Sequence, residues 1–120
     1  KPEVAFLNLS VEDFEEKTPG RFFQKEKVEL GEGFKQFIVI HCPSNESPIH
    51  NHQDDNMLET HLLIWGSGKF VIYDKGKPIK ELPLIKGKFH EIFSNIQNNP
   101  DHKYVTGAEG SVTLALEKHI

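Results

Sequence analysis

Two pairs of polar residues between positions 50 and 61 are the part of this sequence best suited to chemistry. His50 and His52 are separated by one residue, and so are Glu59 and His61. Alternate side chains of an extended strand lie on the same face, so each pair can present both of its side chains to one ion. The spacing therefore predicts a metal site, and polar side chains that merely face solvent are the simpler alternative.

The segments around these pairs are expected to position them. Residues 53–56 are polar and turn-forming, which predicts a hairpin that brings the two pairs together. The run Leu62–Trp65 follows the second pair and is apolar on both faces, as is typical of a buried strand. A second run, Phe37–Ile40, is also apolar on both faces and is predicted to be a central strand covered on each side.

The whole chain has the pattern of a single all-β domain. Its 120 residues are enough for one core, and its 9 glycines and 7 prolines fall between short apolar runs. Strand-like runs that recur about every 8 to 12 residues suit a sandwich or a barrel. One short N-terminal helix is predicted over Val11–Lys17, where Ser10 and Asp13 can form a capping box.

Composition excludes several classes of partner. The net charge is −4 with acidic and basic residues interspersed, so no basic patch for nucleic acid is expected. No apolar run approaches the roughly 20 residues that a membrane span needs. The single cysteine, Cys42, allows no intramolecular disulfide, which favours a reducing compartment, the cytoplasm.

The polar residues resemble the two motifs of the cupins, a superfamily of small metal-binding β-barrels. In the first cupin motif His-x-His is followed by a glutamate and, after six intervening residues, by a glycine; these positions hold His50, His52, Glu59 and Gly66. The second motif has a proline and a third histidine after a Gly-led strand; here these are Gly87, Pro100 and His102, and Thr106 stands where the family usually has Asn. The resemblance implies a jelly-roll barrel (double-stranded β-helix) over residues 34–117, preceded by an arm, a short helix and edge strands in residues 1–33.

The resemblance also implies a metal shell of His50, His52, Glu59 and His102. It favours one divalent transition metal, iron or manganese first, with zinc or nickel as alternatives. Six residues separate His52 from Glu59, where cupins usually have three or four. If the strand register slips by one residue, Glu59 turns outward and a three-histidine site remains. His41 and His90 are left open as further members of the site.

A small-molecule pocket is expected beside the metal. Its predicted wall consists of apolar and aromatic residues, each of which is also typical of plain core: Phe37, Val39, Leu63, Trp65, Tyr104 and Leu114. His61 is the candidate for acid–base chemistry, because an imidazole titrates near neutral pH. A histidine simply bonded to a neighbouring strand is an equal alternative.

Two classes of function remain open from the sequence. The first is a metal-dependent enzyme for small molecules: a dioxygenase, or an isomerase or lyase acting on a carbonyl held by the metal. Without Glu59 as a ligand, the resemblance shifts to the three-histidine thiol dioxygenases. The second is a non-catalytic binding or sensor cupin. A homodimer is also predicted, because the runs Leu62–Ile64 and Phe70–Tyr73 are apolar on the face opposite the expected pocket.

Overall fold

The computed structural model describes residues 8–51, 57–92 and 100–119 and forms one antiparallel sheet of eight strands. The strand order is β1-β2-β4-β8-β5-β6, with β3 paired to β4 and β7 paired to β5. The strands are β1 (Phe14–Thr18), β2 (Arg21–Gln24), β3 (Val28–Gly31), β4 (Phe34–His41), β5 (Met57–Asp74), β6 (Lys77–Pro83), β7 (Phe89–Ile92) and β8 (Asp101–His119). The predicted all-β class is confirmed.

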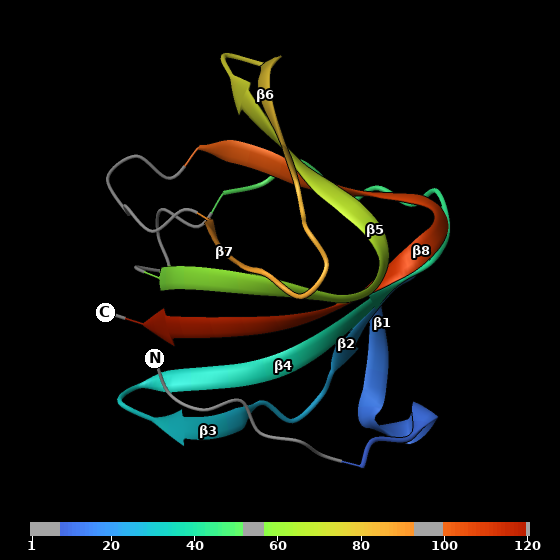
Figure 1. Cartoon of the computed structure of the whole chain (residues 1–120), viewed down its shortest axis with the longest axis vertical. Helices are drawn as coiled ribbons and strands as arrows, with labels where there is room; N and C mark the ends of the chain where they lie inside the picture. Colours follow the sequence, from blue (N-terminus) through green and yellow to red (C-terminus); the bar gives the residue numbers. More distant parts are fainter. Residues whose placement is uncertain (1–7, 52–56, 93–99, 120) are drawn as a thin grey trace.

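Two long strands give the sheet its jelly-roll shape. β5 and β8 pair from Met57 opposite His119 to Tyr73 opposite Asp101, with bulges between Leu63 and Trp65 and between Gly66 and Gly68. Bulges bend a strand and increase its twist. Figure 1 shows both strands turning over along one side of the molecule, so that their two halves lie in two layers. The sequence suggested separate short strands here, which the structure joins into two.

The predicted N-terminal helix is wrong beyond its first turn. Only Val11–Asp13 is helical, as one 3₁₀ turn, although the capping box between Ser10 and Asp13 is present. Phe14–Thr18 is instead strand β1, which pairs with β2 across a turn at Gly20, where φ is 77°. A seven-residue helix is marginal in water, whereas the hairpin ladder satisfies its backbone groups against a neighbour.

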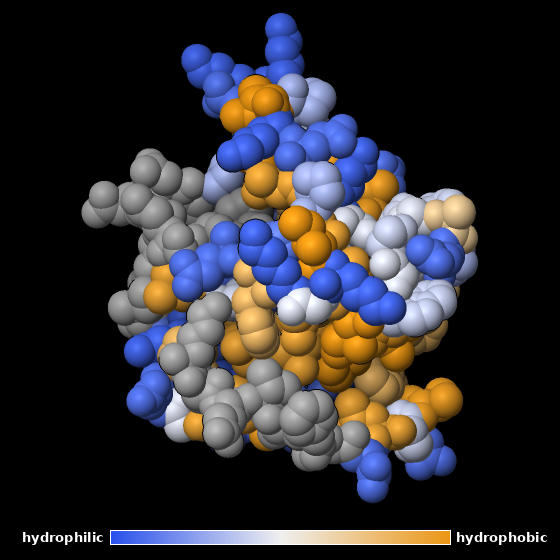
Figure 2. Space-filling view, in the orientation of Figure 1, coloured by the Kyte–Doolittle hydropathy of each residue, from blue (hydrophilic) through white to orange (hydrophobic). Residues whose placement is uncertain are grey.

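The interior between the two layers holds two apolar clusters. One consists of Leu63, Phe70, Ile72, Leu84 and Tyr104, and the other of Phe37, Val39 and Ala115 with Phe23 packed against it. Hydrophobic atoms gather in the middle of the face seen in Figure 2, whereas the projecting β6 hairpin is mostly hydrophilic. Within the described ranges, no helix is long and apolar enough to cross a membrane.

Candidate functional site

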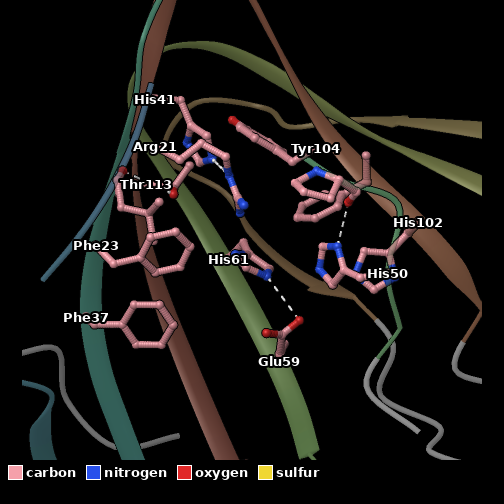
Figure 3. A pocket seen from close by; sticks show the side chains of 13 residues that line it. Arg21, Phe23, Phe37, His41, His50, Glu59, His61, His102, Tyr104 and Thr113 are labelled. Carbon is pink, nitrogen blue, oxygen red and sulfur yellow. Dashed lines mark hydrogen bonds and ion pairs between the residues drawn. The ribbon is translucent and has the colours of Figure 1, made fainter. Parts of the chain in front are cut away.

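A cavity of about 290 Å³ lies inside the curved sheet, between the two apolar clusters. Its wall is formed by β2, β4, β5, β8 and the segment before residue 51, through Arg21, Phe23, Phe37, Val39, His41, Pro48, His50, Glu59, His61, Phe70, His102, Tyr104 and Thr113. Figure 3 shows four imidazole rings, one carboxylate and one guanidinium among these side chains. Four histidines around a mostly apolar hollow are unusual for a plain core, so this cavity is the candidate site.

Two of the histidines meet through a backbone bridge. The amide of His50 donates to the carbonyl of His102 at 2.9 Å, and the amide of His102 donates to the carbonyl of His50 at 2.8 Å. Their ring centroids lie 4.4 Å apart. The structure therefore brings together two predicted metal ligands that are 52 positions apart in the sequence.

Both rings of this pair are held in the same way. Nδ1 of His50 lies 2.7 Å from the carbonyl oxygen of Pro48, and Nδ1 of His102 lies 2.9 Å from that of Pro100. A carbonyl oxygen only accepts, so each Nδ1 carries the proton and each neutral ring keeps its lone pair on Nε2. Metal-binding histidines are typically held by such a bond from the other ring nitrogen. The donor set of this pair thus fits a transition metal.

Of the other two predicted ligands, His52 and Glu59, the structure describes only Glu59. His52 lies outside the described residues. Glu59 is on the cavity wall and only 8% exposed, which is the inward orientation expected from an unslipped hairpin. Within the described part of the chain, no three histidine, cysteine or acidic side chains come close enough to form a metal-binding group. The four-residue shell therefore stays a prediction.

Glu59 and His61 form a second pair on β5. His61 Nε2 lies 3.6 Å from Glu59 Oε2, and both side chains are nearly buried on the same face of the strand. Nε2 of His61 is buried and has no hydrogen-bond partner in the part of the chain that the structure describes. An imidazole beside a carboxylate at a cavity wall is a typical arrangement of acid–base catalysts.

The end of the cavity formed by β2 and β4 carries a cation beside a neutral imidazole. Nε of Arg21 donates to Nε2 of His41 at 3.3 Å, and Nη1 of Arg21 donates to the hydroxyl of Thr18 at 3.3 Å. Burial first, and then the nearby charges of Arg21 and His61, lower the pKa of His41 to about 3. His41 is therefore neutral at pH 7. Nothing local in the sequence marks Arg21, which the sequence analysis did not single out.

Three of the six predicted pocket residues line the cavity. These are Phe37, Val39 and Tyr104. The hydroxyl of Tyr104 donates to Oγ of Ser111 at 3.0 Å, and burial raises the pKa of that phenol. Tyr104 is thus a neutral, fixed part of the wall.

The other three do not line the cavity. Leu63 and Leu114 are buried behind the wall, at 2% and 4% exposed. Trp65 is wrong as a pocket residue: it is 50% exposed, because the bulge between Leu63 and Trp65 interrupts the alternation of faces. His90, left open above, also lies off the cavity wall, where Nε2 accepts from the amide of Ile85 at 3.0 Å.

Comparison with known proteins supports a fold but no closer relationship. No protein-family model and no curated protein matches the sequence. Solved structures do match. KdgF from Halomonas sp. has a TM-score of 0.65 and 14% identity, over 98% of this chain and 96% of KdgF. AerE from Microcystis aeruginosa has a TM-score of 0.67 and 14% identity, over 89% of this chain and 45% of AerE.

A mutant of the oxalate decarboxylase OxdC from Bacillus subtilis has a TM-score of 0.67 and 19% identity, over 98% of this chain. The chain spans 31% of the length of that enzyme. Other matching structures are described as a cupin domain and as a cupin-superfamily protein. The chain therefore has the cupin fold, as the sequence motifs predicted.

Proposed function

We propose that this cavity is the active site of a metal-dependent enzyme that acts on a small molecule. The observation that supports the metal most directly is the matched pair of bonds from Nδ1 of His50 and His102 to carbonyl oxygens. His50, His52, Glu59 and His102 would hold the ion. Imidazole and carboxylate ligands suit iron, manganese, zinc and nickel. Iron or manganese is favoured by the resemblance to cupins, with zinc or nickel as alternatives.

The metal would supply a Lewis acid with open coordination positions. The chain's own residues would do the rest. Phe23, Phe37 and Val39 form an apolar wall that limits water around a bound molecule. His61, supported by Glu59, would take up or release a proton on the substrate.

The reaction type is proposed as a dioxygenation, or as an isomerisation or elimination on a carbonyl compound. One of the structures with the same fold is that of an enzyme, oxalate decarboxylase. This supports an enzymatic role for this chain but indicates no particular substrate for it. A non-catalytic cupin that binds or senses a ligand is the alternative, since it would use the same cavity.

A reconstitution experiment tests the proposal. The protein is loaded with iron(II), manganese, nickel or zinc, analysed for metal, and then screened against thiols, catechols, keto acids and sugar phosphates by mass spectrometry and an oxygen electrode. We expect about one metal per chain and one turned-over class of compound. Metal without turnover of any compound would favour the binding cupin, and equal metal content in a His50→Ala, His52→Ala double variant would refute the site.

We also propose a homodimer, which would form through a different surface from the one predicted from the sequence. Phe70, which was predicted to be part of the outer patch, instead lines the cavity. Ile64, Trp65 and Phe89 are 42%, 50% and 37% exposed on β5 and β7, and such apolar exposure favours association. We expect light scattering to give twice the mass of the chain at micromolar concentration, and a Trp65→Glu, Ile64→Glu variant to give the monomer mass. A monomeric unmodified protein would contradict this.

A further inference from the structure

The Arg21 side chain has no acidic partner within the described part of the chain. Its guanidinium has five N–H donors, of which one reaches His41 and one reaches Thr18. It also lies over the ring of Phe23, 5.0 Å from the centroid. Burial lowers the pKa of Arg21, but an arginine remains charged at every ordinary pH. The cavity wall therefore contains a cation with unused donors.

The carboxylate on the cavity wall does not neutralise this charge. Glu59 is paired with His61, and no ion pair between Glu59 and Arg21 is present among the described residues. His41 is neutral and cannot serve as a counter-charge. A partly buried charge without a partner is costly, which makes the binding of an anion here favourable.

His41 fixes the position of this cation. Its Nε2 accepts from Arg21, so the proton of the neutral ring is on Nδ1. That Nδ1 is buried and has no hydrogen-bond partner among the described residues, and the residue is only 6% exposed. A nitrogen with no accessible surface does not face the cavity, so His41 acts here through Nε2, which holds the guanidinium of Arg21 in place. Arg21 and His41 lie side by side on the cavity wall (Figure 3).

We infer that the substrate of this cavity carries a carboxylate that binds Arg21, whose guanidinium His41 and Thr18 hold in place. This inference rests on the proposed function, which places the metal-facing part of the substrate at His50 and His102. The planar fork of a guanidinium matches the two oxygens of a carboxylate, and the terminal nitrogens of Arg21 carry the N–H groups that His41 and Thr18 do not use. Figure 3 shows the Arg21 and His41 end apart from the pair of His50 and His102.

The size of the cavity limits the rest of the molecule. A volume of about 290 Å³ equals roughly ten water molecules at about 30 Å³ each. The substrate is thus a small organic acid of about that many non-hydrogen atoms, with its carboxylate at one end and its reacting group at the other. The apolar wall between the ends favours a short carbon chain.

Calorimetric titration with succinate and with its uncharged diamide tests the inference without a turnover assay. We expect metal-free protein to prefer succinate by at least about 10-fold, since hydrogen bonds to a charged group are lost with the diamide. Arg21→Gln should weaken succinate binding by about 10- to 100-fold. Arg21→Lys keeps the charge but loses the planar fork, so its affinity for succinate should lie between those of Arg21→Gln and the unmodified protein. Lys69→Gln, which removes an exposed cation paired with Glu81, should bind like the unmodified protein.

Two results would overturn the inference. One is equal binding of succinate and the diamide by metal-free protein, a comparison that needs no variant to fold. The other is unchanged succinate binding in Arg21→Gln. Metal content, measured on the same samples, separates this inference from the proposed function: an absence of metal binding refutes the proposed site, whereas the titrations of metal-free protein still decide the role of Arg21.

Discussion

A His102→Ala variant is expected to bind its metal at least about 100-fold more weakly than the unmodified protein. Changes outside the ligand shell already cost about 10- to 100-fold in metal affinity, so removing a ligand should cost at least the upper end of that range. His102 is 1% exposed and Nδ1 of its ring is held by the carbonyl oxygen of Pro100, so the ring is fixed in place. Competition titration with a chromogenic chelator measures the change.

The matched control for this variant is His90→Ala. It also removes a histidine from a strand, but that ring bonds to the amide of Ile85 and lies off the cavity wall. We expect unchanged metal affinity in His90→Ala, and thermal unfolding curves of both variants to confirm that they fold. Equal affinity in the two variants would exclude His102 as a ligand.

Glu59→Gln decides the composition of the shell in the same assay. Glutamine keeps the size of the side chain and removes its charge, so a coordinating Glu59 predicts a loss of about 10- to 100-fold. If affinity stays unchanged while His102→Ala abolishes binding, the shell consists of three histidines. That result would favour a thiol dioxygenase among the proposed reactions.

The sequence predicted the parts of the site that have a local pattern. His50 and His102 were identified through the two cupin motifs, and alternation along a strand placed Glu59 and His61 on one face. The sequence also contains a repeated signal that was not used: a proline stands two residues before His50 and before His102. In the structure the carbonyls of these prolines hold the two rings, so the repeat marks the orientation of the ligands as well as their position.

The features that the sequence did not predict depend on contacts distant in the chain. Arg21 is a single arginine at the start of a short strand, and it stands out only because none of its partners among the described residues is acidic. Trp65 was assigned to the pocket as one of its apolar and aromatic residues, but an extra residue inserted between Leu63 and Trp65 interrupts the alternation of faces and leaves Trp65 exposed. The helix over Val11–Lys17 was predicted from its cap, but pairing with β2 determines the conformation after Asp13.

Gly66→Ala is expected to lower the free energy of unfolding by about 2 to 5 kcal/mol. Gly66 has a φ of 83°, a conformation that costs other residues roughly 1 to 2 kcal/mol. A Cβ at this position would also overlap the carbonyl oxygen of Gly110 on β8, and forcing extra atoms into a packed site costs about 1 to 3 kcal/mol. This glycine, at the bend of β5, thus allows the close approach that turns the sheet over on itself.

Gly76→Ala is the control that separates the two causes. Gly76 lies in the turn between β5 and β6 with a φ of 78°, and a Cβ there would meet nothing within 4 Å. It should therefore show only the conformational cost, about 1 to 2 kcal/mol. For a chain of this size 1 kcal/mol lowers Tm by roughly 4 °C, so calorimetry should find a clearly larger decrease for Gly66→Ala. Equal decreases would mean that the contact with Gly110 contributes nothing, and that the bend of the sheet does not depend on it.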